Sequence, residues 1–99
     1  PVLTYGPAVQ NNLLKFIINQ AEKNKVDFQR LAASRSTGTD TDAFAYSNKG
    51  VASALISLPL RYMHTTVEMC SKDDVNSVIE LIYKSLIALK NGQTFHYLK

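Results

Sequence analysis

The run VASALISL, residues 51–58, constrains the fold more than any other stretch of this chain. It is apolar almost throughout and is followed by Pro59, and it lacks the strict alternation of a strand with one solvated face. A continuous run of this length predicts a strand that is buried on both faces, as in the parallel sheets of α/β proteins. Such a strand needs neighbouring strands on both of its edges and helices on both faces of its sheet.

Three further segments are predicted before this run. Residues 1–7 are expected to be extended or loop. Five apolar residues recur at helical spacing and predict an amphipathic helix over residues 11–25: Leu13, Leu14, Ile17, Ile18 and Ala21. Residues 26–34 alternate apolar and polar side chains well enough to predict a strand.

The clearest predicted element is a helix over residues 71–92. Ser71 and Asp74 resemble a capping box at its start. Its apolar residues recur with the helical period and predict a stripe that faces the core: Val75, Val78, Ile79, Ile82, Leu86 and Leu89.

The order of these elements predicts an α/β fold. A helix, a strand, a polar loop with a short helix, a second strand and a last helix imply two parallel strands joined by a crossover, with helices packed on the sheet. A sheet of two strands is marginally stable alone. The sequence therefore predicts a segment of a larger α/β sheet.

Length and composition exclude several other classes of protein. The 99 residues are enough for one small domain and leave no room for a second. The net charge of +3 comes from scattered lysines and arginines, so no nucleic-acid partner is expected. No apolar stretch approaches the roughly 20 residues that span a bilayer, so no membrane partner is expected. A single cysteine, Cys70, excludes a disulfide framework and favours a reducing compartment.

His64 is the first candidate for a functional residue. It follows Pro59 by five residues and is expected just beyond the C-terminal end of the predicted buried strand. In open α/β sheets, ligand-binding groups gather at that end. Neutral imidazole is the commonest metal-binding side chain, so His64 is either a metal ligand or an ordinary loop histidine.

Carboxylates supply the other candidates. Asp40 and Asp42 lie in the polar loop GTDTD, where they either serve a metal or substrate amine or act as turn residues. Glu68 is either an acceptor for the second ring N–H of His64 or a solvated glutamate. The motifs of a phosphate-binding loop and of a serine nucleophile elbow are both absent.

The stretch GTDTDAFAYSNKGVASALISLPLRYMHTTVE, residues 38–68, resembles the C-terminal part of the glutamyl-aminopeptidase and deblocking-aminopeptidase family. Its members are cytoplasmic binuclear metallopeptidases, many of them labelled endoglucanase or cellulase. The residues that fall in register are Gly38, Thr39, Asp40, Gly50, Val51, Pro59, Arg61, Tyr62, His64, Val67 and Glu68. Thr65-Thr66 replaces the Ser-Pro of the family pattern, and loss of the proline is expected to loosen the loop.

This resemblance implies roles for individual residues. His64 is the last metal ligand in chain order, and Asp40 and Glu68 shape or support the site around it. The intact enzyme holds two divalent metal ions, zinc or cobalt. The other ligands and the general-base glutamate lie upstream in the family, so no catalytic residue is expected within residues 1–99.

The same resemblance implies an architecture and a function. Residues 1–99 are expected to form the C-terminal segment of a three-layer αβα zinc-peptidase-like catalytic domain. The intact enzyme is a cytoplasmic hydrolase and homo-oligomer that removes N-terminal residues from peptides, and this segment has the remainder of the catalytic domain as its partner. The isolated segment is expected to be inactive. The alternative is a non-catalytic binding or assembly module derived from that fold.

Overall fold

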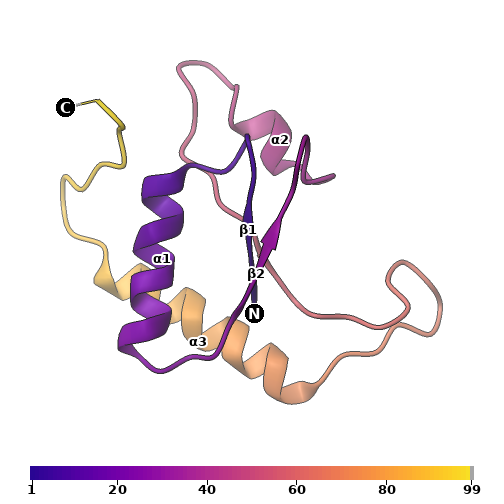
Figure 1. Cartoon of the computed structure of the whole chain (residues 1–99). Helices are drawn as coiled ribbons and strands as arrows, with labels where there is room; N and C mark the ends of the chain where they lie inside the picture. The colour runs from indigo at the N-terminus through magenta and orange to yellow at the C-terminus, as the bar shows by residue number, and fades with distance from the viewer. Residues whose placement is uncertain (99) are drawn as a thin grey trace.

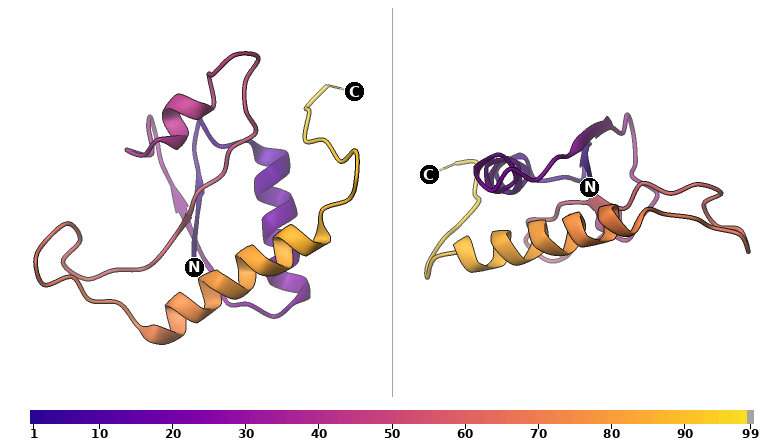
Figure 2. Two further views of the ribbon diagram at one scale, coloured as in Figure 1. Left: turned by 180° about the vertical axis from the view of Figure 1, so that it is seen from behind. Right: turned by 90° about the horizontal axis from the view of Figure 1, so that it is seen from below.

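The computed structural model describes residues 1–98 and has the predicted α/β class. Its elements are β1 (Val2–Tyr5), α1 (Asn11–Lys23), β2 (Gln29–Ala32), α2 (Thr41–Phe44), β3 (Ile56–Ser57) and α3 (Lys72–Ala88). Helix α1 lies beside the strands, and α3 crosses α1 on one side of the layer that α1 and the strands make (Figures 1 and 2).

The three strands form one mixed sheet with the order β2-β1-β3. β1 and β2 are parallel, with Val2 opposite Gln29 and Tyr5 opposite Ala32. β3 is antiparallel to β1, with Val2 opposite Ser57 and Leu3 opposite Ile56. Helix α1 is the crossover between the two parallel strands, which need a connection of this length to run in the same direction.

The predicted pairing of strands is wrong. The strands expected in residues 26–34 and 51–58 become β2 and β3, but β1 lies between them and β3 runs antiparallel. The run 51–58 contributes only a two-residue strand, and its side chains are half-buried or exposed. A strand is buried on both faces only when its second edge and both faces are covered, and residues 1–98 do not supply that cover.

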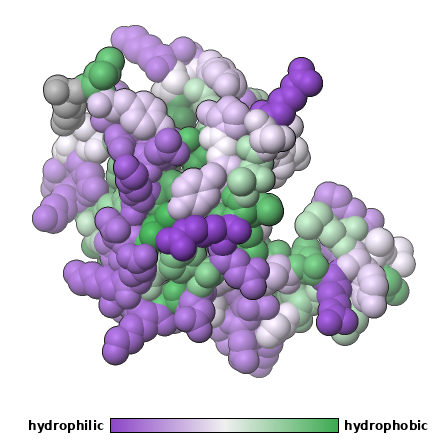
Figure 3. Space-filling view, viewed as in Figure 1, coloured by the Kyte–Doolittle hydropathy of each residue, from purple (hydrophilic) through white to green (hydrophobic). Residues whose placement is uncertain are grey.

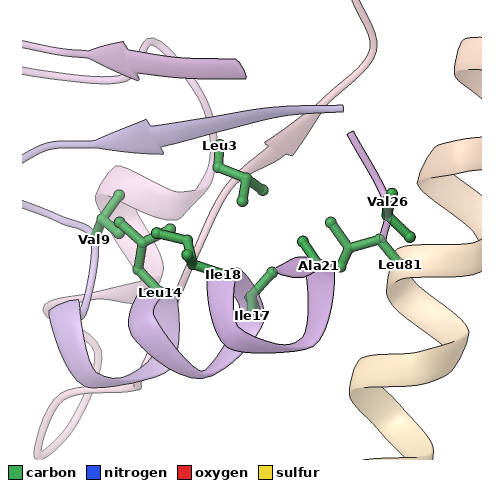
Figure 4. Packing of buried hydrophobic residues seen from close by; sticks show 8 residues of the cluster. All are labelled: Leu3, Val9, Leu14, Ile17, Ile18, Ala21, Val26 and Leu81. Carbon is green, nitrogen blue, oxygen red and sulfur yellow. The ribbon is translucent and has the colours of Figure 1, made fainter. Parts of the chain in front are cut away.

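The core lies between α1, β1 and α3 (Figure 4). It consists of Leu3, Val9, Leu14, Ile17, Ile18, Ala21, Val26 and Leu81. Four of these residues belong to the stripe predicted for the first helix, so that prediction is confirmed. Gln10 caps α1, because its side-chain oxygen accepts a hydrogen bond from the Leu13 N–H at 2.7 Å.

Helix α3 forms as predicted but packs through a different face. Ser71 is its N-cap, and the Ser71 hydroxyl accepts a hydrogen bond from the Asp73 N–H at 3.2 Å. The residues of α3 that are buried are Leu81 and Ser85. Four residues of the predicted core stripe are exposed instead: Ile79, Ile82, Leu86 and Leu89. Most of the stripe predicted to face the core therefore lies outside the core of residues 1–98.

The chain should lose stability when Leu81, but not Leu86, is shortened. Leu81 is 0% exposed and Leu86 is 61% exposed on the same helix. We expect Leu81→Ala to lower the free energy of unfolding by about 2–5 kcal/mol, because it removes buried contacts and leaves a cavity. Leu86→Ala is the matched control, with an expected change within about 0.5 kcal/mol. Urea unfolding of the 99-residue chain measures both, and equal losses would contradict this description of the core.

Candidate functional site

Residues 61–69 form a closed loop that projects from the body of the molecule, at the right of Figure 1. Its two ends are held together as an antiparallel bridge between Arg61 and Met69. The Arg61 N–H donates to the Met69 carbonyl at 2.8 Å, and the Met69 N–H donates to the Arg61 carbonyl at 3.1 Å. All residues of this His64 loop are exposed.

Hydrogen bonds within the loop fix the backbone around His64. Tyr62 and His64 have positive φ angles of 58° and 62°, which cost energy for residues with a side chain. The Thr65 N–H and the Thr65 hydroxyl both donate to the Tyr62 carbonyl, at 3.2 and 2.6 Å. The Val67 N–H donates to the same hydroxyl at 3.3 Å. The hydrogen bonds of Thr65 thus stabilise the loop, in which Thr65-Thr66 replaces the Ser-Pro of the family pattern.

Glu68 contacts His64 through the main chain. Its Oε1 accepts a hydrogen bond from the backbone N–H of His64 and not from the imidazole ring, and Glu68 is exposed. Within residues 1–98 no side chain hydrogen-bonds either ring nitrogen of His64. Glu68 therefore positions the residue, and the imidazole remains open to a ligand.

The two aspartates of the polar loop differ in their contacts. Asp40 is exposed and occupies the N-cap position of α2 without a capping hydrogen bond from its side chain. The Asp42 carboxylate accepts from the Thr37 N–H at 3.1 Å, the Thr37 hydroxyl at 2.9 Å and the Gly38 N–H at 3.0 Å. Of the two interpretations of Asp42, the contacts match turn chemistry.

Acid should release the Asp42 turn. The Thr37 N–H, together with the Thr37 hydroxyl and the Gly38 N–H, holds the pKa of the Asp42 carboxyl below its ordinary value. A lowered pKa stabilises the fold above the ordinary pKa of aspartate, and this stabilisation is lost as the pH falls through the folded pKa. We expect the NMR chemical shifts of the Thr37 and Gly38 amides to change with pH, with a midpoint at the lowered pKa of Asp42. NMR of Asp42→Asn should show no such titration, with Asp40→Asn as the matched control, and a titration that survives in Asp42→Asn would contradict the assignment.

The structure does not bring Asp40 and His64 together. Since β3 is antiparallel to β1, its C-terminal end lies beside the N-terminal end of β1, and the His64 loop continues from there. Asp40 follows the C-terminal end of β2, at the opposite end of the sheet, near α2 in Figure 1. The expectation that the strand before His64 is parallel to its neighbour is wrong, because β3 runs antiparallel to β1. Residues 1–98 contain no group of three histidine, cysteine, aspartate or glutamate side chains placed to hold a metal ion.

A hollow at the base of the His64 loop was not predicted. It has a volume of about 380 Å³ and is lined by Pro59, Leu60, Arg61, Met69, Cys70, Ser71 and Asp74. The sequence shows that the His64 loop ends close to the start of the last helix. The hollow forms only because the bridge between Arg61 and Met69 closes the loop, and no local sequence pattern predicts that bridge.

The sequence pattern of the M42 glutamyl aminopeptidases matches residues 2–81, a range that includes the polar loop and the His64 loop. The chain belongs to the M42 glutamyl aminopeptidase family. The resemblance seen in residues 38–68 is thereby confirmed. None of the helices in residues 1–98 is long and apolar enough to cross a membrane.

Individual proteins that this chain resembles agree with this assignment. A lysyl aminopeptidase of Pyrococcus furiosus is 37% identical over 90 residues. A TET aminopeptidase from the marine sediment archaeon Thaumarchaeota archaeon SCGC AB-539-E09 superposes with a TM-score of 0.82 at 26% identity. Each match covers 91% of this chain and 26% of the relative. An aminopeptidase from the archaeon Desulfurococcus kamchatkensis superposes over 88% of this chain and 26% of its own, with a TM-score of 0.73 at 28% identity. This M42 chain thus spans about a quarter of the length of these relatives.

Proposed function

We propose that this chain is a segment of the catalytic domain of a metal-dependent aminopeptidase, to which it contributes His64 as a metal ligand. Family membership over residues 2–81 supports the activity, since the relatives that match are aminopeptidases. The geometry of the His64 loop supports the ligand. Hydrogen bonds that Thr65 donates and that Glu68 accepts fix the backbone, and within residues 1–98 no side chain hydrogen-bonds a ring nitrogen of the exposed imidazole.

The residues present fit one coordination position of a metal. His64 would supply a ring nitrogen as the ligand. Glu68 accepts a hydrogen bond from the backbone of His64 and so restrains the point at which this side chain leaves the main chain. When bound, two divalent ions such as zinc or cobalt polarise the peptide carbonyl and activate a water molecule. The remaining ligands and the general base come from sequence outside these 99 residues, and no catalytic residue is assigned here.

The substrates that follow are peptides with a free N-terminus, which the intact enzyme shortens by one residue at a time. We assign the intact enzyme to the cytoplasm as a homo-oligomer, as the family resemblance implies. Asp40 is assigned a role in shaping the site. Because Asp40 and the His64 loop lie at opposite ends of the sheet, Asp40 exerts this role through the polar loop and not by contact with His64.

A chimera tests this function. In it, the segment of the Pyrococcus furiosus lysyl aminopeptidase that matches this chain is replaced by this chain. We expect the chimera to release lysine from lysyl-anilide and to lose this activity when a chelator is added. A folded chimera that is inactive with added zinc or cobalt would overturn the proposal in favour of a non-catalytic module.

A further inference from the structure

The outer side of α3 carries a continuous apolar surface that residues 1–98 leave uncovered. We call Ile79, Ile82, Tyr83, Leu86 and Ile87 the α3 stripe. All five are exposed, and Ile79, Leu86 and Ile87 are each exposed by at least 60%. Figure 2 shows this helix in front of α1 when the molecule is seen from behind, with nothing lying over its outer side.

The spacing of the α3 stripe is that of a packing surface. Its residues lie at relative positions 0, 3, 4, 7 and 8, which place them on one face of an α-helix. The other side of α3 already packs on α1 through Leu81. A helix that is apolar on both sides is typical of the interior of a larger protein. Exposed apolar patches on soluble proteins mark interaction surfaces.

A second uncovered surface lies at the edge of the sheet. β2 pairs with β1 only, so within residues 1–98 its outer edge has no partner strand. All four residues of β2 are exposed, including Leu31 at 55%. Further hydrophobic residues are visible across the middle of the face drawn in Figure 3. The unpaired N–H and C=O groups of such an edge can pair with a further strand, and the exposed apolar residues beside it can pack against further side chains.

We infer that the α3 stripe packs against the part of the aminopeptidase domain that lies outside these 99 residues. This inference rests on the proposed function. Its main support is that the fold of this chain recurs in a TET aminopeptidase with a TM-score of 0.82 but fills only 26% of that protein. The remaining three quarters of such a chain supply the apolar surface that a helix with two apolar sides requires.

A second copy of this chain fits the uncovered surfaces less well. Two copies that pair through their α3 stripes cover those residues but leave the edge of β2 and Leu31 open. The remainder of an α/β domain offers both strands and apolar side chains. It therefore accounts for both surfaces, and pairing of two copies is one of the outcomes that the experiment distinguishes.

Hydroxyl-radical footprinting of the isolated chain and of the chimera tests the inference. In the isolated chain, Tyr83 and Leu86 should be oxidised readily, like the exposed Tyr97 of the tail. In the chimera, oxidation of Tyr83 and Leu86 should fall to the level of the buried Leu81. Tyr97 is the matched control for Tyr83. An α3 stripe that is oxidised equally in both proteins would overturn the inference, as would a stripe already protected in the isolated chain because copies pair.

Stability gives a second readout that does not depend on metal or activity. Leu86→Ala should have little effect on unfolding of the isolated chain but should destabilise the chimera as much as Leu81→Ala does. If the chimera does not fold, the isolated chain is mixed with the remainder of the lysyl aminopeptidase, and sedimentation should show an association that Leu86→Glu abolishes. No such association would overturn the inference. If the α3 stripe is protected from oxidation but the chimera is inactive, only the proposed function is contradicted. If the chimera is active but the α3 stripe stays exposed, only this inference is contradicted.

Discussion

His64→Ala in the chimera is expected to lower metal content and aminopeptidase activity together. The substitution removes a nitrogen ligand from a site where each catalytic metal depends on few protein groups. Changes to groups that merely orient a ligand typically reduce metal affinity about 10–100-fold, so loss of the ligand itself should cost at least that much. The fold should be retained, because His64 is exposed on a projecting loop.

His96→Ala is the matched control for this prediction, since His96 is the other histidine of the chain and lies in the exposed tail. Elemental analysis of the purified proteins gives the metal content, and hydrolysis of lysyl-anilide gives the activity. Excess zinc or cobalt should restore part of the activity of His64→Ala. Full metal occupancy and normal turnover in His64→Ala would show that the ligand assignment is wrong.

The isolated 99-residue chain is expected to have no aminopeptidase activity. A catalytic zinc normally has three protein ligands and a water molecule, and a site with two metals needs more ligands. Residues 1–98 offer no group of three suitable side chains. The carboxylates of Asp40 and Asp42 lie at the other end of the sheet from His64, and Glu68 already accepts a hydrogen bond from the backbone.

Lysyl-, leucyl-, glutamyl- and aspartyl-anilides, each with and without zinc or cobalt, test this expectation. The chimera serves as the positive control and a chelator as the negative control. No release of the anilide product above background is expected from the isolated chain. Turnover that is sensitive to the chelator and that follows the purified chain through every step would mean that the catalytic groups lie within it.

Local patterns in the sequence predicted the helices well. α1 follows from five apolar residues at helical spacing, and α3 begins at the serine that the capping pattern indicated. Residues 1–7 were expected to be extended or loop, because Pro7 disfavours a helical conformation of Gly6, and β1 lies within them. Its place in the middle of the sheet depends on pairing with residues more than twenty positions away, which no local pattern encodes.

The face of α3 shows a different limit of sequence reasoning. Its apolar positions were identified correctly, but the helix is apolar on two sides, and the periodicity does not say which side meets α1. The side of α3 that packs on α1 buries Leu81 and Ser85. The stripe predicted from the sequence includes Ile79, Ile82 and Leu86, the residues that this chain leaves open.

Sequence motifs identified the candidate residue His64, whereas the predicted arrangement of the strands contributed little. The position of His64 after the apolar run and the family pattern both pointed to it, although the argument from parallel strands was wrong. The hydrogen bond from the His64 backbone to Glu68 and the ties made by Thr65 depend on positive φ angles within the loop. Such angles are set by closure of the loop between Arg61 and Met69, which the sequence alone did not reveal.

A crystal structure of the zinc-loaded chimera, with anomalous diffraction at the zinc edge, tests the central claim most directly. The claim is that this chain supplies His64 to the metal centre of an aminopeptidase. We expect an anomalous peak about 2.0–2.1 Å from a ring nitrogen of His64, the usual length of a zinc–histidine bond. Fully occupied zinc sites whose ligands do not include His64 would contradict the claim.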